Sequence, residues 1–285
     1  MRVSPNRIIC TQNLVVEAEK DMTVETARKN THPSAEWLLP AVLSTTAGSV
    51  DVIGFLALGG LFTAHITGNL VVLAAHYVTG GFSQIGPLLS VPVFVAVLGT
   101  VVMTFEAIDK TTLGGRRTLL VLHAVLLAGF LGLGVGLGPF GNPDSMMAVL
   151  VGMLGVAAMA TQNALVRLAL PGSPSTAVLT TNTTQLTIDV AKLIRRRGAP
   201  ADLARAQQRA SMTFPCVFGF MGGCAAGAFL ELRFGLWALA LPVALAVVAV
   251  PLGELWKKAA RPLDIRTERN LTECARDNLS GAQMK

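Results

Sequence analysis

The sequence predicts an all-α integral membrane protein, and three observations lead to that fold class. First, 52% of its 285 residues are hydrophobic and 14% are charged, whereas soluble domains carry about 25% charged residues. Second, positions 37–105 contain no Lys, Arg or Glu and a single Asp, which is long enough for more than one crossing of about 20 residues. Third, the bases behind the net charge of +6 gather between apolar segments, a pattern typical of cytoplasmic loops. We therefore expect a lipid bilayer, and no nucleic acid, as the partner.

Six apolar segments are long enough to cross the bilayer as helices. They lie near 37–60, 87–108, 117–138, 145–168, 210–231 and 235–255. Two further segments, 62–79 and 174–191, have helical length but are rich in Thr, Asn, Gln, His and Asp. The composition leaves open whether these two polar segments cross fully.

Loop charges predict the orientation. Segments 80–87 and 138–144 contain no base, whereas 109–117 contains three and 192–209 contains six, so the first two should lie outside and the last two in the cytoplasm. Two full crossings between the outer loop 138–144 and the six bases would place those bases outside. We therefore predict that each polar segment is a broken or half helix that completes one crossing with its apolar neighbour. This gives about six net spans in the bacterial inner (plasma) membrane, with both termini cytoplasmic.

Polar sequence flanks the predicted transmembrane domain, 37–256, at both ends. Residues 1–36 carry five basic and five acidic residues and no apolar stretch with a cleavage site, so we expect a disordered cytoplasmic extension and no signal peptide. Residues 257–285 are predicted to form a cytoplasmic tail. The two halves of the transmembrane domain are expected at about 37–138 and 145–256.

A polar motif occurs once in each half. Residues 63–69 read Thr-Ala-His-Ile-Thr-Gly-Asn, and 176–182, 113 positions later, read Thr-Ala-Val-Leu-Thr-Thr-Asn; we call them the first and the second polar motif. Because the first polar segment should end outside and the second inside, the halves would form an inverted 3+3 repeat, a construction found in many secondary transporters. The alternative is a chance match of four residues in seven.

Polar side chains within the apolar segments form the candidate site. Asp51 lies within the first apolar segment, where a carboxylate costs about 2.5–3.5 kcal/mol on insertion scales. His65 carries an imidazole that can exchange protons at physiological pH. We predict a proton or cation site at Asp51, in a midplane cavity shared by both halves. The candidate residues for binding a substrate or an ion are Asp51, His65, Thr67, Asn69, Gln162, Asn163, Thr180 and Asn182.

The same residues also permit a structural interpretation. Asp51 could hold the helices together, and hydrogen bonds of Thr and Asn between membrane helices stabilise by only about 0.6–2 kcal/mol. We expect a structural role for His123, and pairing of Asp189 with Lys192 or Arg195. Glycines spaced by four residues predict close helix packing, within one chain or in a homo-oligomer. These glycines are Gly132 with Gly136, Gly134 with Gly138, and Gly219, Gly223 and Gly227.

The sequence around Asp51 resembles the signature of the YoaK-like bacterial inner-membrane proteins, a family of unknown function. That signature is G-x-x-D-x-x-x-F-L-x-L-G-G-x-F-x-x-H-x-T-G-N, and it begins here at Gly48 and ends at Asn69. The Gln-Asn-Ala at 162–164 and the second polar motif are similar to later segments of the family, although Thr181 stands where the first motif has Gly68. The resemblance covers about 37–256 and implies a membrane protein of about six helices, without indicating a substrate.

We expect a secondary transporter of a small solute, with a proton as the candidate coupling ion. The alternative is a non-transporting membrane scaffold or accessory subunit, in which the polar motifs hold helices together. Neither catalytic motifs nor paired metal-ligand spacings occur in the sequence, so we expect no enzyme, no metal and no cofactor. A membrane enzyme would need a water-filled cavity that joins Asp51 and His65.

Overall fold

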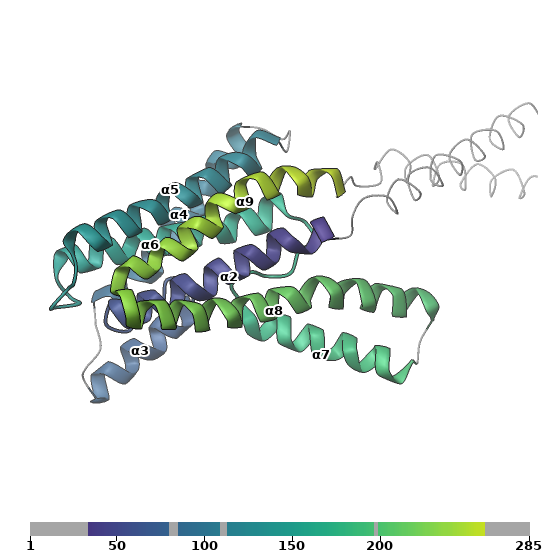
Figure 1. Cartoon of the computed structure of the whole chain (residues 1–285), viewed down its shortest axis with the longest axis horizontal. Helices are drawn as coiled ribbons and strands as arrows, with labels where there is room; N and C mark the ends of the chain where they lie inside the picture. The colour runs from purple at the N-terminus through teal and green to yellow at the C-terminus, as the bar shows by residue number, and fades with distance from the viewer. Residues whose placement is uncertain (1–33, 80–84, 109–112, 197–198, 260–285) are drawn as a thin grey trace, which may run out of the picture. The chain divides into compact units, whose positions relative to one another are not determined.

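The computed structural model describes residues 34–79, 85–108, 113–196 and 199–259. Over these residues the chain is helical and contains no strand, which confirms the predicted fold class. The elements are α2 (Ser34–Ala57), α3 (Ile66–Thr79), α4 (Ile85–Ile108), α5 (Leu113–Leu137), α6 (Met146–Ala169), α7 (Leu179–Arg195), α8 (Pro200–Phe234), the 3-10 helix η1 (Gly235–Leu239) and α9 (Ala240–Ala259) (Figure 1).

The chain divides into two compact units. One is Glu36–Glu254, which contains all of the helices except the first two residues of α2 and the last five of α9, and the other combines Met1–Ala35 with Leu255–Lys285. Most of the predicted N-terminal extension and C-terminal tail, 1–33 and 260–285, lies outside the described residues. Their predicted disorder and cytoplasmic location therefore stay predictions.

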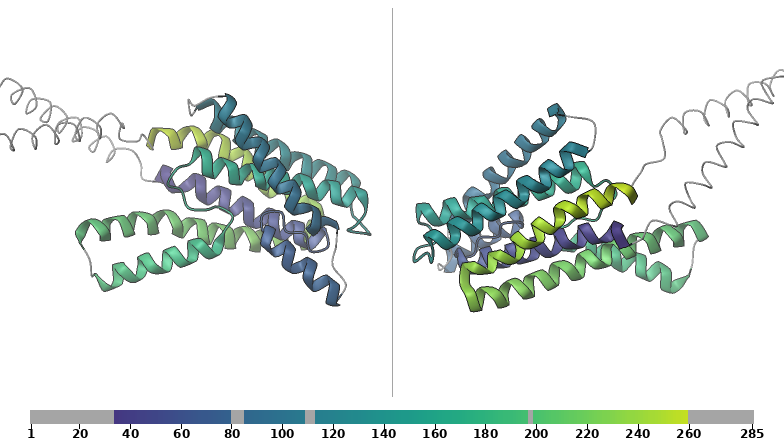
Figure 2. Two further views of the ribbon diagram at one scale, coloured as in Figure 1. Left: turned by 180° about the vertical axis from the view of Figure 1, so that it is seen from behind. Right: turned by 45° about the horizontal axis from the view of Figure 1, so that its top comes forward.

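Five helical stretches of the described chain are long and apolar enough to cross a membrane. Four of them lie in α2, α4, α5 and α6, and the fifth, Pro200–Trp256, runs through α8, η1 and most of α9. The chain reverses at η1, so α8 and α9 run in opposite directions (Figure 2). Five of the six predicted apolar segments thus lie largely within one long helix each, and the sixth, 235–255, is divided between η1 and α9. The number of crossings stays a prediction.

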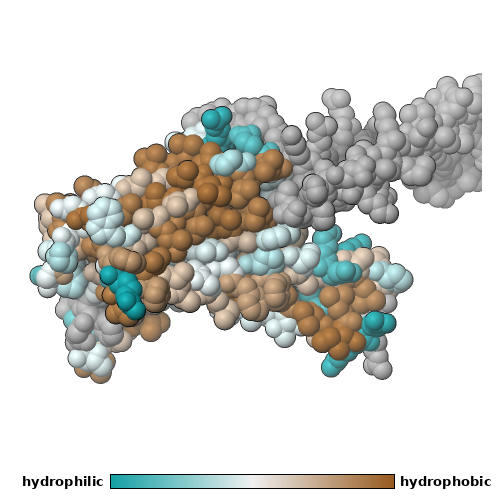
Figure 3. All heavy atoms as spheres, viewed as in Figure 1, coloured by the Kyte–Doolittle hydropathy of each residue, from teal (hydrophilic) through white to brown (hydrophobic). Residues whose placement is uncertain are grey.

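The outer surface of these helices is apolar over a wide area. Figure 3 shows hydrophobic side chains over the region of α5 and α9, where Val125 is 60% exposed and Val247 is 57% exposed. A water-soluble monomer seldom exposes so broad an apolar surface. Contact with hydrocarbon chains removes that surface from water, so the bilayer is the natural environment of this face.

α2 and α6 are the most buried of the long helices, and each ends at a break in the helical backbone. Of their apolar windows 67% and 72% are buried, against 11% for α4. Segment 58–65 connects α2 to α3, and segment 170–178 connects α6 to α7. α2 and α6 run in opposite directions, as do α3 and α7 (Figures 1 and 2).

The short helices begin later than the sequence indicated. The polar segments were expected to be helical over 62–79 and 174–191, but α3 begins at Ile66 and α7 at Leu179. The first three residues of each polar motif are therefore non-helical. Side chains accept backbone N–H groups that lack a helical partner there: Asp51 accepts that of Ala64, and Ser175 accepts that of Val178.

Glycines allow α2 and α8 to pack closely. A Cβ atom added to Gly223 would lie 2.2 Å from the carbonyl oxygen of Thr45, and one added to Gly48 would lie 2.2 Å from that of Phe220. Backbone is therefore packed against backbone, and the predicted packing role of the glycines in α8 is confirmed. On α5, Gly134 contacts side chains of η1, whereas no described atom lies within 4 Å of the corresponding position on Gly132. A homo-oligomer through such a face stays a prediction.

Candidate ion-binding site

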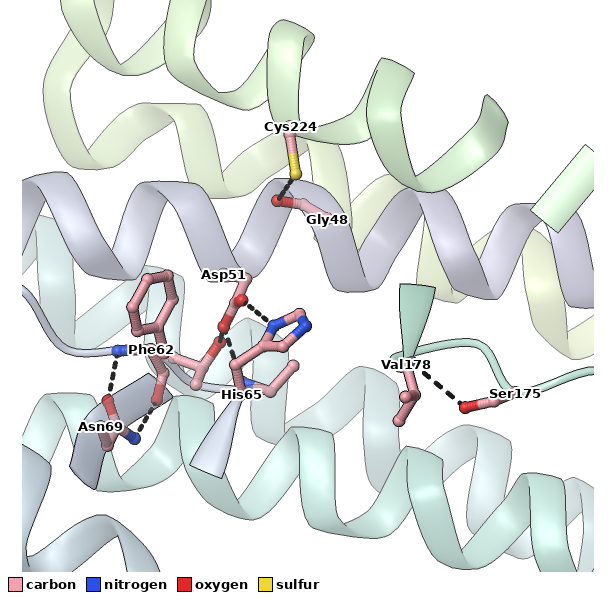
Figure 4. Close-up of polar contacts among 10 residues, drawn as sticks. Gly48, Asp51, Phe62, His65, Asn69, Ser175, Val178 and Cys224 are labelled. Atoms are coloured by element: carbon pink, nitrogen blue, oxygen red, sulfur yellow. Dashed lines mark hydrogen bonds and ion pairs between the residues drawn. The ribbon is translucent and has the colours of Figure 1, made fainter. Parts of the chain in front are cut away.

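The carboxylate of Asp51 is the centre of a buried cluster of hydrogen bonds. The residue lies on the last two turns of α2 and is 3% exposed. Its Oδ1 accepts the backbone N–H of Ala64 at 2.7 Å and the hydroxyl of Thr63 at 3.3 Å. Its Oδ2 lies 2.5 Å from Nδ1 of His65 (Figure 4). The first polar motif therefore wraps around the carboxylate with three consecutive residues.

The chain reversal after α2 makes this arrangement possible. Gly59 and Gly60 have φ angles of 65° and 94°, in the left-handed region that glycine adopts without steric cost. This turn brings residues 63–65 back alongside α2. A Cβ atom on Gly54 would lie 3.0 Å from the methyl group of Thr63, so this glycine leaves room for the returning segment.

His65 connects the buried carboxylate to the surroundings. Its side chain is 35% exposed, whereas that of Asp51 is 4% exposed. The ring also makes edge contacts with the rings of Phe62 and Phe220, with centroids 6.1 Å and 5.6 Å apart. Figure 4 shows the far edge of the imidazole pointing away from Asp51. The pair can therefore hold a proton between carboxylate and imidazole and exchange it at the exposed edge of the ring.

Asn69, on α3, holds the segment 58–65 through the backbone of Phe62. Its Oδ1 accepts the N–H of Phe62 at 2.8 Å, and its Nδ2 donates to the carbonyl of Phe62 at 2.7 Å and to the hydroxyl of Ser90 at 2.8 Å. The residue is fully buried. Because both N–H groups of its amide are donated to protein groups and its oxygen accepts the N–H of Phe62, Asn69 positions the segment that contains His65.

The second polar motif shows a related, neutral arrangement. Nδ2 of Asn182 donates to the carbonyl of Ser175, seven residues earlier, just as Asn69 donates to Phe62. Nε2 of Gln162 donates to the hydroxyl of Thr176 at 2.9 Å and to the carbonyl of Leu43 at 3.0 Å. Thr63 and Thr176 hold the same position in the two motifs. The hydroxyl of Thr63 donates to Asp51, whereas that of Thr176 accepts from Gln162.

The remaining candidates lie apart from these clusters. Thr67 and Thr180 are exposed on α3 and α7, and Asn163 donates to the carbonyl of Met159 within its own helix. Thr63 and Ala64, which sequence reasoning did not select, are direct partners of Asp51. The repetition of Thr-Ala in both motifs was the signal for them. A single cavity shared by both halves stays a prediction.

Two other polar residues have partners that the structure identifies. His123 is buried, with Nδ1 3.0 Å from the carbonyl of Ala158, in agreement with a structural role. Asp189 was expected to pair with Lys192 or Arg195, and its ion pair is instead with Arg209 on α8. The expectation was wrong because the carboxylate faces α8, which carries Arg209.

These features define a polytopic helical membrane protein in which a buried carboxylate is bonded to a partly exposed imidazole. The chain belongs to the family described as "Protein of unknown function (DUF1275)", whose profile matches residues 39–252. A stretch of 35 residues is 60% identical to the UPF0700 transmembrane protein YoaK of Bacillus subtilis (strain 168). That stretch is 12% of this chain and 16% of the relative. The resemblance to YoaK-like membrane proteins of unknown function is thereby confirmed, and no solved structure matches the chain.

Proposed function

We propose that the protein is a secondary transporter of a small solute in the bacterial inner membrane, with the Asp51–His65 pair as its proton-binding site. The observation that carries this proposal is the carboxylate of Asp51, which is buried on α2 against the non-helical segment 58–65 and bonded to an imidazole that is partly exposed. Ionisable groups within membrane helices are rare and are usually functional. A carboxylate serving packing alone would not need a partner that can exchange protons.

The site would work through its effect on the 58–65 segment. With one proton on the pair, Asp51 attracts His65 and accepts the N–H of Ala64 and the hydroxyl of Thr63. A second proton neutralises the carboxylate and weakens all three interactions, because hydrogen bonds to a charged acceptor are about twice as strong as neutral ones. The segment would then be released from α2, so that proton binding biases the position of α3.

The predicted inverted repeat is consistent with this assignment. The two motifs share the hydrogen bond from Asn to the carbonyl seven residues earlier, and their helices run in opposite directions (Figure 1). Transporters built in this way bind substrate at broken helices near the midplane, and they alternate by rocking one repeat against the other. We assign α2 to α5 to one repeat and α6 to α9 to the other, with the ionisable site in the first.

Proton-coupled flux tests the proposal. Purified full-length protein is reconstituted into vesicles that contain the pH dye pyranine, and amino acids, sugars and organic cations are added in turn under a pH gradient. We expect a solute-dependent proton flux that Asp51→Asn abolishes. The matched control is Asp202→Asn, which removes a carboxylate whose side chain is 65% exposed and should leave the flux unchanged.

The variant Asp51→Asn also distinguishes transport from the alternative function, a non-transporting scaffold or accessory subunit. Asparagine retains an oxygen that can accept the N–H of Ala64, so Asp51→Asn should fold. A native flux that keeps its pH dependence in Asp51→Asn would remove the pair from the mechanism. If no solute produces flux and Asp51→Asn lowers only the melting temperature, the protein is better described as a membrane scaffold or accessory subunit.

A further inference from the structure

The helix α7 and the beginning of α8 form an arm, here defined as residues 179–196 and 199–211. An ion pair with a buried carboxylate holds the arm together. The side chain of Asp189 is fully buried, and Arg209 donates to both its oxygens, from Nε at 3.1 Å and from Nη2 at 2.7 Å. Gln185 donates to the same carboxylate at 2.9 Å. The negative charge of Asp189 is thus paired with Arg209 inside the arm.

The face of α7 opposite Asp189 carries no charge over most of its length. At 100° per residue this face contains threonines and aliphatic residues, and all of them are exposed. They are Thr180, Thr183, Thr184, Thr187, Ala191 and Ile194. The hydroxyl of Thr187 donates to the carbonyl of Thr183 within the helix, so it needs no water. The face extends roughly 21 Å along the helix at about 1.5 Å per residue, which suits contact with acyl chains.

Cations gather where this uncharged face ends. Lys192, Arg195 and Arg196 are exposed at the end of α7, and Arg205, with a side chain 71% exposed, lies on α8. Arg196 has a φ of 47° and ends the helix, with its N–H bonded to the carbonyl of Lys192. Among the described residues of the arm, the acids are Asp189, already paired, and Asp202, which lies 3.7 Å from Arg205. Figure 3 shows polar and hydrophobic side chains side by side on this part of the molecule.

We infer that Lys192, Arg195 and Arg196 bind the phosphate groups of anionic phospholipids at the membrane surface. The uncharged face of α7 would lie among the acyl chains, which places the three cations at the depth of the headgroups. Guanidinium groups match phosphate oxygens in a bidentate manner, and basic residues next to a membrane helix are attracted to anionic lipid. This surface is separate from the Asp51 site and does not depend on the proposed transport.

Lipid binding by the purified full-length protein tests this inference. The probe is a fluorescent phosphatidylglycerol in detergent, followed by anisotropy, with unlabelled phosphatidylglycerol, phosphatidylcholine and inorganic phosphate as competitors. We expect competition by phosphatidylglycerol alone. The triple variant Lys192→Gln, Arg195→Gln, Arg196→Gln should bind about 100-fold more weakly, because each cation near an anionic surface contributes roughly fivefold.

Two control variants separate a defined site from net charge and from misfolding. Arg117→Gln, Arg167→Gln, Arg233→Gln removes three exposed arginines elsewhere and should retain native affinity. Arg195→Lys with Arg196→Lys preserves both charges and should lose less than tenfold. The inference would be overturned if both triple variants lost lipid affinity equally. It would also be overturned if the variant of Lys192, Arg195 and Arg196 kept native affinity. Competition by inorganic phosphate or by polyglutamate as strong as that by phosphatidylglycerol would show that lipid is not the preferred partner.

Discussion

At the scale of single residues, Asn69 and Asn182 make similar hydrogen bonds to the backbone of their motifs, but Asn69 makes more of them. Asn69 makes three hydrogen bonds, two to Phe62 and one to Ser90, whereas Nδ2 of Asn182 bonds the carbonyl of Ser175. Each asparagine closes the chain onto the residue seven positions earlier. Asn69 additionally joins this loop to α4, so the first motif is tied to the helix that follows it.

Substitution of these asparagines should reveal that difference. Asn69→Ala leaves both backbone groups of Phe62 without a partner, and each unsatisfied buried group costs about 1–3 kcal/mol. We expect Asn69→Ala to lower the free energy of unfolding by about 2–4 kcal/mol and Asn182→Ala by about 1 kcal/mol. Denaturant unfolding in detergent measures both, and Thr67→Ala, at an exposed position, serves as the neutral control. Equal losses for the two asparagines would contradict the distinction.

At the scale of elements, the crossing of α2 and α8 depends on glycines that face a backbone. Gly223 lies against the backbone of Thr45, and Gly227 lies against that of Ser49. Gly222, next to Gly223, is different, because a Cβ atom added there meets open space. Adjacent glycines of one helix thus differ sharply in their environment. Cys224, next to Gly223, donates its thiol to the carbonyl of Gly48 at 3.3 Å, so the same turn of α8 also bonds α2.

An alanine scan of this turn provides a matched pair. Gly223→Ala places a methyl group against the backbone of α2 and should destabilise the protein by about 1–3 kcal/mol, the usual cost of overpacking. Gly222→Ala meets open space and gains helix propensity of up to about 1 kcal/mol, so its stability should be unchanged or higher. Melting temperatures in one detergent compare the two. The packing assignment fails if Gly222→Ala is the more damaging change.

At the scale of the whole molecule, the proposed inverted repeat requires the loop between α5 and α6 and the loop between α7 and α8 to lie on opposite sides of the membrane. Gly141, between α5 and α6, and Ala199, before α8, are both exposed. In a variant whose four cysteines are serine, an impermeant maleimide should label Gly141→Cys in intact cells. Ala199→Cys should react only after permeabilisation. Labelling of both from the same side would exclude the proposed topology.

The sequence could predict the apolar helices because hydropathy is summed over windows of about 20 residues and depends little on distant contacts. The sequence also indicated Asp51 as a candidate site residue, since a carboxylate in an apolar segment is conspicuous in any fold. The starts of α3 and α7 could not be predicted in this way. Residues 63–65 leave the helix because Asp51 bonds two of their side chains and the backbone N–H of Ala64, and that compensation exists only after the chain has turned.

The sequence by itself determined a membrane protein with a polar motif in each half, because composition and charge are properties of the chain alone. Only the tertiary structure decided which groups meet. It placed Thr63, Ala64 and His65 around Asp51, and it paired Asp189 with Arg209 instead of with the nearer bases. The physical reason is that an ion pair needs the right direction and burial as well as proximity in sequence, and the packing of helices sets both.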